Sequence, residues 1–166
     1  PAPMSTDGGY VDILTRYGTP PNPDIYGDRI SFTLGLLGVG TEYFGDVIDY
    51  KPRFTDDGYL LMNTDQEYEF KPYETNADFP NPAKPNGMLS LWWRDMLIDY
   101  DPVLNKGVTS KYFMDAFLVE FDDLEEFWQG YTMDFEVFAW QTPDPELGWP
   151  DIIFAYDNVV GEWYDD

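Results

Sequence analysis

Asp99, Asp101 and Asn105 place three side-chain oxygen ligands in one short segment, DYDPVLNKG, which closes at Gly107. Oxygen ligands at alternating positions of a turn are what a hard cation such as Ca²⁺ requires. The spacing is D-x-D-x3-N, which differs from the EF-hand pattern D-x-[DN]-x-[DN]-G with its distant Glu. Because the chain has 32 acids, such groups also arise by composition alone. The segment therefore predicts either a calcium site or a solvated turn.

Tryptophans offer a second kind of chemistry, the stacking of an indole ring on a sugar ring. Trp92 and Trp93 are adjacent in the stretch LSLWWRDM. Successive side chains of a strand point to opposite faces, so these two cannot occupy the same core layer. We expect both to be structural, and the functional alternative is a stacking platform. For a carbohydrate-binding surface, the candidate ligand-binding residues are Trp128, Trp140 and Trp149.

Acids also gather in the segment EFDDLEE, residues 120–126. Two carboxylates can serve a glycosidase, but nothing in the sequence selects a pair, and we expect a solvated strand end. The chain has no histidine and no cysteine. This removes the usual general base, the Ser-His-Asp arrangement, thiol nucleophiles and thiolate metal sites. We therefore expect no catalytic residues in this domain.

The net charge is −23, from 32 acids and 9 bases. Such a surface repels phosphate backbones and anionic lipid, so we expect no nucleic-acid partner. No apolar run approaches the roughly 20 residues of a membrane-spanning helix, so we expect no membrane insertion. Simple solubility explains the acidity, and so does a saline or calcium-rich exterior in which cations offset the self-repulsion.

Hydrophobic alternation with a period of two indicates where strands form. It occurs in the segments 30–36, 46–62, 87–96, 115–123, 131–140 and 151–159. Asp57-Gly58 provides a tight turn within the second of these, and Arg94-Asp95 predicts an ion pair at the end of the third. Only residues 122–130 have the pattern of a helical turn. The sequence predicts an all-β fold, an antiparallel, jelly-roll-like β-sandwich with little helix.

The first nine residues, PAPMSTDGG, are small and polar, as in an interdomain linker. We expect residues 1–9 to be that linker and residues 10–166 to form a single β-sandwich domain. The chain begins at Pro1 and not at Met, so we expect a mature product or, in preference, a piece of a longer polypeptide.

The order of these segments resembles a β-sandwich accessory domain of large secreted subtilisin-like serine proteases from marine-type bacteria. It is also distantly similar to nidogen-type extracellular modules, although Ser90-Leu91 stands where their pattern often has Ala-Pro. The resemblance spans residues 44–161. Its four steps are Gly58-Tyr59-Leu60, Leu91-Trp92-Trp93-Arg94-Asp95, Val119-Glu120-Phe121 and Ile153-Phe154-Ala155-Tyr156.

The resemblance implies that these positions are framework and that any proteolytic triad lies elsewhere in a secreted parent chain. We therefore expect a non-catalytic accessory domain that supports folding, stability or substrate engagement. Its partners would be the other domains of the parent chain and a protein or polysaccharide substrate. Two alternatives stay open, a carbohydrate-binding module and a calcium-stabilised extracellular adhesin or surface module.

Overall fold

The computed structural model describes residues 10–28, 30–33, 42–43, 46–47, 53–61, 88–92, 94–113, 116–127, 129–140 and 152–158. The expected linker at residues 1–9 and the second half of the predicted strand at 30–36 lie outside these ranges. In chain order the elements are α1 (Ile13–Tyr17), β1 (Ser31–Phe32), β2 (Glu42–Tyr43), β3 (Asp46–Val47), β4 (Arg53–Thr55), β5 (Tyr59–Leu61), β6 (Met88–Ser90), β7 (Met96–Leu97), β8 (Gly107–Tyr112), β9 (Ala116–Glu126), β10 (Thr132–Trp140) and β11 (Ile152–Asp157).

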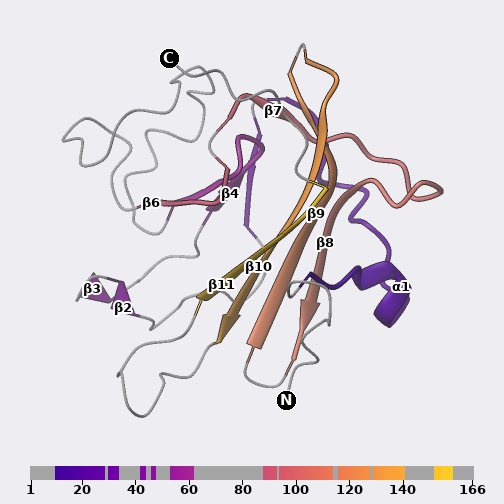
Figure 1. Ribbon diagram of the computed structural model, residues 1–166. Helices are drawn as coiled ribbons and strands as arrows, with labels where there is room; N and C mark the ends of the chain where they lie inside the picture. The colour runs from indigo at the N-terminus through magenta and orange to yellow at the C-terminus, as the bar shows by residue number, and fades with distance from the viewer. Residues whose placement is uncertain are drawn as a thin grey trace.

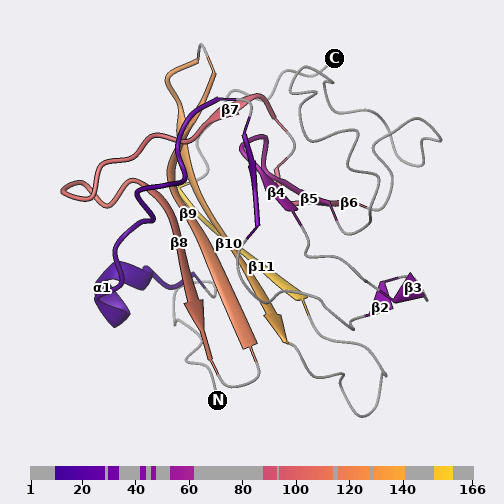
Figure 2. The same ribbon diagram turned by 180° about the vertical axis from the view of Figure 1, so that it is seen from behind.

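Two antiparallel sheets make up most of the described structure (Figures 1 and 2). The smaller sheet has the strand order β1-β4-β5-β6. The larger has the order β11-β10-β9-β7, and β8 also pairs with β9. Strands β2 and β3 form a separate ladder. The prediction of an all-β, sandwich-like fold with antiparallel strands is confirmed.

The hydrophobic core lies between the two sheets. Phe54 of β4 packs against Phe121 of β9, with ring centroids 5.9 Å apart, and Phe121 stacks on Phe135 of β10 at 4.6 Å. All three side chains are fully buried. The predicted alternation in the segments 115–123 and 131–140 is confirmed, because the residues of β9 and β10 that reach this core alternate along each strand: Phe117, Val119 and Phe121, and Met133, Phe135, Val137 and Ala139.

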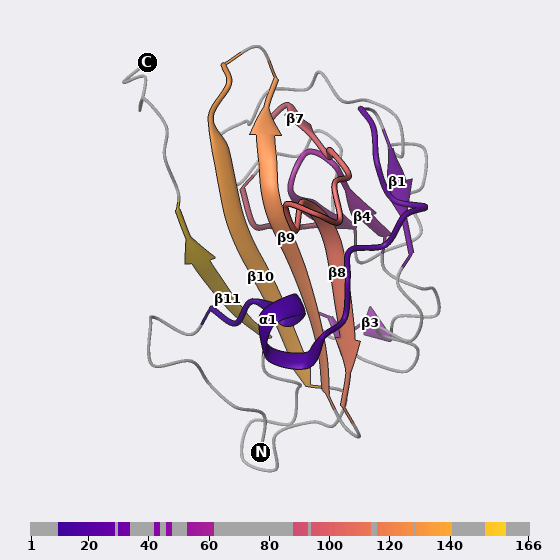
Figure 3. The same ribbon diagram turned by 90° about the vertical axis from the view of Figure 1, so that its right-hand side faces the viewer.

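The other face of the larger sheet is covered by the N-terminal segment, residues 10–17, which we call the N-terminal cover. Figure 3 shows α1 in front of β8, β9 and β10, with the smaller sheet behind them. The side chain of Asp12 caps α1 by accepting the Thr15 N–H at 2.8 Å, and Gly18 ends the helix in the left-handed conformation. Among the described residues, no helix has the length and apolar character to cross a membrane.

The helical turn predicted at residues 122–130 is wrong in its first half. Strand β9 continues through Glu126, where it pairs with Met96 of β7. Leu124 is fully buried in the core and lies opposite Met133 of β10. Tertiary burial of Leu124 and the strand hydrogen bonds on both sides outweigh the local helical preference of this acidic segment.

The period of two predicted one continuous strand over residues 87–96, and this prediction is wrong. The structure divides the stretch into β6 and β7. Strand β6 stops at Ser90 because the next two backbone N–H groups, of Leu91 and Trp92, both donate to the Gly58 carbonyl at 3.0 Å. The chain resumes pairing in β7. Arg94 forms an ion pair with Glu126, the last residue of β9, at 3.0 Å, and its predicted ion pair with Asp95 stays a prediction.

The Asp57-Gly58 turn between β4 and β5 is confirmed, and Gly58 has φ +70°. A Cβ atom there would lie 3.2 Å from Trp92 Cβ and 3.5 Å from Phe135 Cζ. Gly130 has nearly the same φ, +69°, with nothing within 4 Å of its virtual Cβ. Gly58→Ala therefore combines backbone strain with a packing clash, whereas Gly130→Ala has the strain alone.

We expect Gly130→Ala to cost about 1–2 kcal/mol of unfolding free energy and Gly58→Ala at least about 1 kcal/mol more. Urea unfolding followed by tryptophan fluorescence measures both. Equal losses in the two variants would contradict the close packing of the turn against Trp92 and Phe135.

Candidate functional site

The outer face of the larger sheet, beneath the N-terminal cover, is lined by carboxylates. Glu120 of β9 lies directly opposite Glu136 of β10. Asp122 and Asp134 follow on the same face, since alternate residues of a strand share a face. Glu120 is 0% exposed, Glu136 1% and Asp134 7%. The expectation of a solvated strand end is therefore wrong for Glu120, because the N-terminal cover shields this face from water.

Two of these carboxylates hold the N-terminal cover on the sheet. The Ile13 N–H donates to both oxygens of Glu120, at 3.2 and 3.1 Å, and the Tyr10 hydroxyl donates to Glu120 Oε1 at 2.9 Å. The Val11 N–H donates to Glu136 Oε2 at 3.0 Å. Glu120 and Glu136 thus accept the hydrogen bonds through which the cover docks.

Burial dominates the electrostatics of this face. It raises the pKa of Glu120 to about 8, against the lowering effect of the hydrogen bonds from Tyr10 and Ile13. Burial also raises the pKa of Glu136 to about 8. The pKa of Asp122 rises to about 8 through burial and then through the charge of Glu120. These carboxyl groups accordingly favour a proton or a nearby positive charge.

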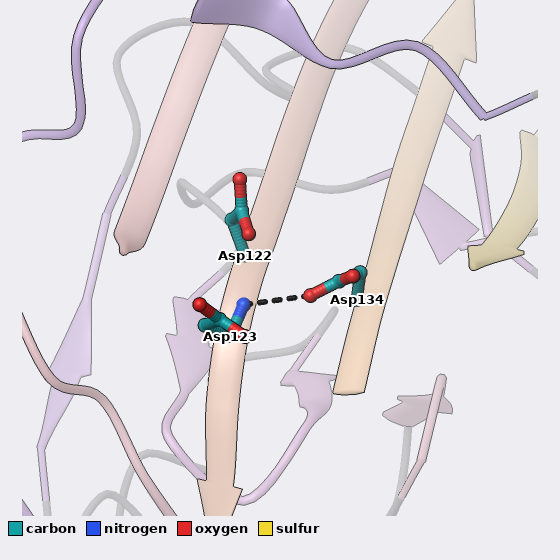
Figure 4. A group of neighbouring side chains, drawn as sticks. All are labelled: Asp122, Asp123 and Asp134. Atoms are coloured by element: carbon teal, nitrogen blue, oxygen red, sulfur yellow. Dashed lines mark hydrogen bonds between the residues drawn. The ribbon is translucent and has the colours of Figure 1, made fainter. Parts of the chain in front are cut away.

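A β-bulge brings a third aspartate to this group. The pairing of β9 and β10 shifts between Met133 and Phe135, and Asp123 on the opposite strand has φ +53°. The Asp123 N–H donates to Asp134 Oδ1 at 2.7 Å. Carboxylate oxygens of Asp122, Asp123 and Asp134 lie within 4.8 Å of one another. Figure 4 shows the three side chains and the bond between Asp123 and Asp134. Three carboxylates in this arrangement can hold a metal ion.

Amide groups and one lysine surround the three aspartates. Asn105 Nδ2 donates to Asp122 Oδ2 and, at 3.4 Å, to Asp12 Oδ1. Asn158 Nδ2 donates to Asp134 Oδ2 at 3.0 Å. Lys106 Nζ lies 3.9 Å from Asp123 Oδ2. The group therefore joins β9 and β10 to the turn that precedes β8.

The three residues of the predicted calcium loop have separate contacts. Asp101 Oδ1 accepts the N–H groups of Val103 and Leu104 at 2.9 and 3.2 Å, which closes the turn. Asp99 is exposed and accepts the next backbone N–H. Asn105 instead turns its amide toward Asp122. Calcium binding by Asp99, Asp101 and Asn105 stays a prediction.

The predicted sugar-binding residues fall mostly outside the described structure. Trp128 and Trp149 lie outside the described residues, as does Trp93, and Trp140 is described only as the last residue of β10. Trp92 is half-buried and packs against the core, which agrees with the structural interpretation of this residue. The carbohydrate-binding surface stays a prediction.

The carboxylate-lined outer face of the larger sheet, which we call the acidic face, could be predicted in part from the sequence. The alternation in β10 puts Asp134 and Glu136 on the face opposite the core, and the same period in β9 does so for Glu120 and Asp122. Pairing these neighbouring strands through their short connection brings the four acids together. No pattern in the sequence predicts the contact between Tyr10 and Glu120, which are 110 residues apart.

Fold and site together define an antiparallel, sandwich-like β protein with a covered, carboxylate-lined sheet face. Comparisons with protein-family models, with curated proteins and with solved structures find no match for the chain. The resemblance to protease accessory domains therefore rests on the sequence pattern alone.

Proposed function

We propose that this domain is a non-catalytic accessory module of a secreted serine protease, which supports folding, stability or substrate engagement. The observation that carries the proposal is the burial of Glu120 and Glu136 under the N-terminal cover. At 0% and 1% exposure, both carboxylates bind groups of the cover and are shielded from a substrate. Their arrangement supports a structural role and not acid–base catalysis.

The positions in the fold of the sequence segments that carry the family resemblance also support the proposal. Gly58 lies in the turn before β5, Tyr59 and Leu60 begin that strand, Val119-Glu120-Phe121 lies within β9, and Ile153–Tyr156 lies within β11. Leu60, Val119 and Phe121 are buried in the core between the sheets. Such positions are framework, as the resemblance implies, and leave proteolysis to another domain of the parent chain.

The first test is the complete open reading frame that contains this segment. We expect it to encode a secretion signal and a subtilisin-like catalytic domain with its Asp, His and Ser. Neighbouring repeats of similar β modules with a cell-wall anchor would contradict the protease assignment and favour the adhesin.

A deletion in the parent protease tests the function itself. Replacing residues 10–158 with a flexible Gly/Ser linker should lower the secreted yield or the rate on a folded protein substrate. The kcat on a short peptide, per molecule of secreted enzyme, should stay unchanged, because the module contributes no catalytic residue. A loss of kcat on the short peptide with normal yield would contradict a non-catalytic role.

A further inference from the structure

The acidic face holds many more carboxyl groups than it has cationic partners among the described residues. Its carboxyl groups are those of Glu120, Asp122, Asp123, Asp134 and Glu136, and Asp12 of the N-terminal cover also contacts Asn105 beside them. Among the residues that the structure describes, Lys106 is the only cationic side chain within ion-pair distance of this group. Burying carboxylates together without a compensating cation is unfavourable, because each loses hydration and repels its neighbours.

Independent evidence comes from buried oxygen atoms that lack a hydrogen-bond partner on the same face. These atoms are Glu136 Oε1, Thr109 Oγ1 and Asn105 Oδ1. Glu136 and Thr109 are each 1% exposed, and both lie directly opposite Glu120, one on each neighbouring strand. Their side chains therefore point into the acidic face, where directly opposed residues are neighbours.

The third atom, Asn105 Oδ1, lies close to the aspartates, because Nδ2 of the same amide group donates a hydrogen bond to Asp122. Buried polar atoms in folded proteins nearly always have a partner, either protein, water or ion. An ionised carboxylate oxygen and an amide carbonyl oxygen are acceptors only. The partner missing at Asn105 Oδ1 must therefore be a donor or a cation.

The spacing of the aspartate oxygens matches the size of a particular class of ion. Calcium binds oxygen ligands at about 2.3–2.6 Å, so two ligands of one ion lie at most about 5 Å apart. Oxygens of Asp122, Asp123 and Asp134 lie within 4.8 Å of one another. Magnesium keeps several waters and is usually bound by one or two carboxylates, whereas calcium takes six to eight oxygen ligands, so a group of three carboxylates suits calcium better.

We propose that the outer face of β9 and β10 binds a hard divalent cation of the Ca²⁺ class through Asp122, Asp123 and Asp134. The buried amide oxygen of Asn105, whose Nδ2 binds Asp122, supplies a further ligand, directly or through water bound to the ion. This site shares only Asn105 with the calcium loop predicted from the sequence. It holds the β9 bulge against β10 and joins it to the turn before β8, whatever the parent protein is.

Calcium titration of the whole chain tests the proposal. The protein is stripped with EDTA, dialysed and titrated with CaCl₂ in a calorimeter, and its Tm is measured with NaCl at equal ionic strength as the control. At a free Ca²⁺ concentration 100-fold above Kd, we expect Tm to rise by about 5–10 °C over the NaCl sample. No binding heat, or an equal rise in NaCl, would overturn the proposal, since screening of the charge would then suffice.

Matched variants locate the site. Asp122→Asn and Asp134→Asn should weaken Ca²⁺ binding by at least about tenfold, since affinity follows the number of charged ligands. Asp99→Asn and Asp101→Asn change the charge equally in the sequence-predicted loop and should keep wild-type affinity. The reverse result would place the ion in the loop and overturn the proposal. If Asp134→Asn does not fold, Asp123→Asn replaces it, because Asp123 is half-buried and lies beside Lys106. This variant should also weaken Ca²⁺ binding by at least about tenfold.

Discussion

Phe135→Ala is expected to lower the free energy of unfolding by about 3–5 kcal/mol. Phe135 is fully buried, stacks on Phe121 at 4.6 Å and lies 6.5 Å from the ring of Tyr156. It also lies against the Gly58 turn of the smaller sheet. Because Phe135 contacts elements of both sheets, its loss leaves a cavity that neither sheet can close by moving alone. Urea denaturation followed by far-ultraviolet circular dichroism gives the value.

Tyr26→Ala is the matched control, since it removes an aromatic ring that is 62% exposed. We expect it to change stability by no more than about 0.5 kcal/mol. A loss at Phe135 no larger than the loss at Tyr26 would contradict the placement of the core between the two sheets.

The core face could be predicted from the sequence because its signal is local. In residues 131–140 a period of two places Phe135 and Val137 together, and no information from elsewhere in the chain is needed. The same period correctly placed Asp134 and Glu136 on the opposite face. It could not predict that this face is buried, because the groups that bind its carboxylates come from 107 and 125 residues away.

The wrong prediction of a helical turn has the same origin. The segment 122–126 has acidic residues that suit a helical turn, yet strand pairing and the burial of Leu124 extend β9 through it. Asn105 is grouped with Asp99 and Asp101 in the sequence because the three are close along the chain, and calcium binding by them stays a prediction. In the fold Asn105 contacts Asp122, which the pairing of Gly107 with Asp122 brings next to the turn. Spacing along the chain identifies local ligands but not those supplied by a neighbouring strand.

The sequence also contains a local signal for the helix α1 that the hydrophobic alternation does not reveal. Asp12 precedes ILTRY and Gly18 follows it, which is the order of an N-cap and a left-handed C-cap. A helix of one turn has little stability alone. Here the Ile13 side chain is fully buried and its N–H donates to Glu120, so tertiary contacts hold the helix.

Asp57 is expected to make the protein less stable as the pH rises from about 4 to about 8. The residue is 3% exposed in the turn between β4 and β5. Burial and then the charge of Asp56 raise its pKa from 3.8 to about 8, Asp95 and Asp28 add to the rise, and the Met96 N–H opposes it. The folded state therefore keeps a proton that the unfolded chain releases near pH 4.

The sign follows from proton binding. Between the unfolded pKa of 3.8 and the folded pKa of about 8, the folded state binds more protons, so the free energy of unfolding falls with increasing pH. The stabilisation is complete below pH 4 and lost above pH 8. For a group this deeply buried the change is on the order of 5 kcal/mol.

Asp57→Asn isolates this contribution, because an amide oxygen can still accept the Met96 N–H while the ionisation is removed. In urea unfolding from pH 4 to pH 8.5 with EDTA present, the variant should match the wild type near pH 4 and exceed it increasingly toward pH 8. Buried carboxylates elsewhere, such as Glu120, affect both proteins equally, so the difference between the two curves reports Asp57. Asp24→Asn, at an exposed position, controls for the change in net charge. Parallel stability curves for Asp57→Asn and the wild type would contradict the prediction. They would mean that water reaches the Asp57 carboxyl group in the folded state and that its pKa is not raised.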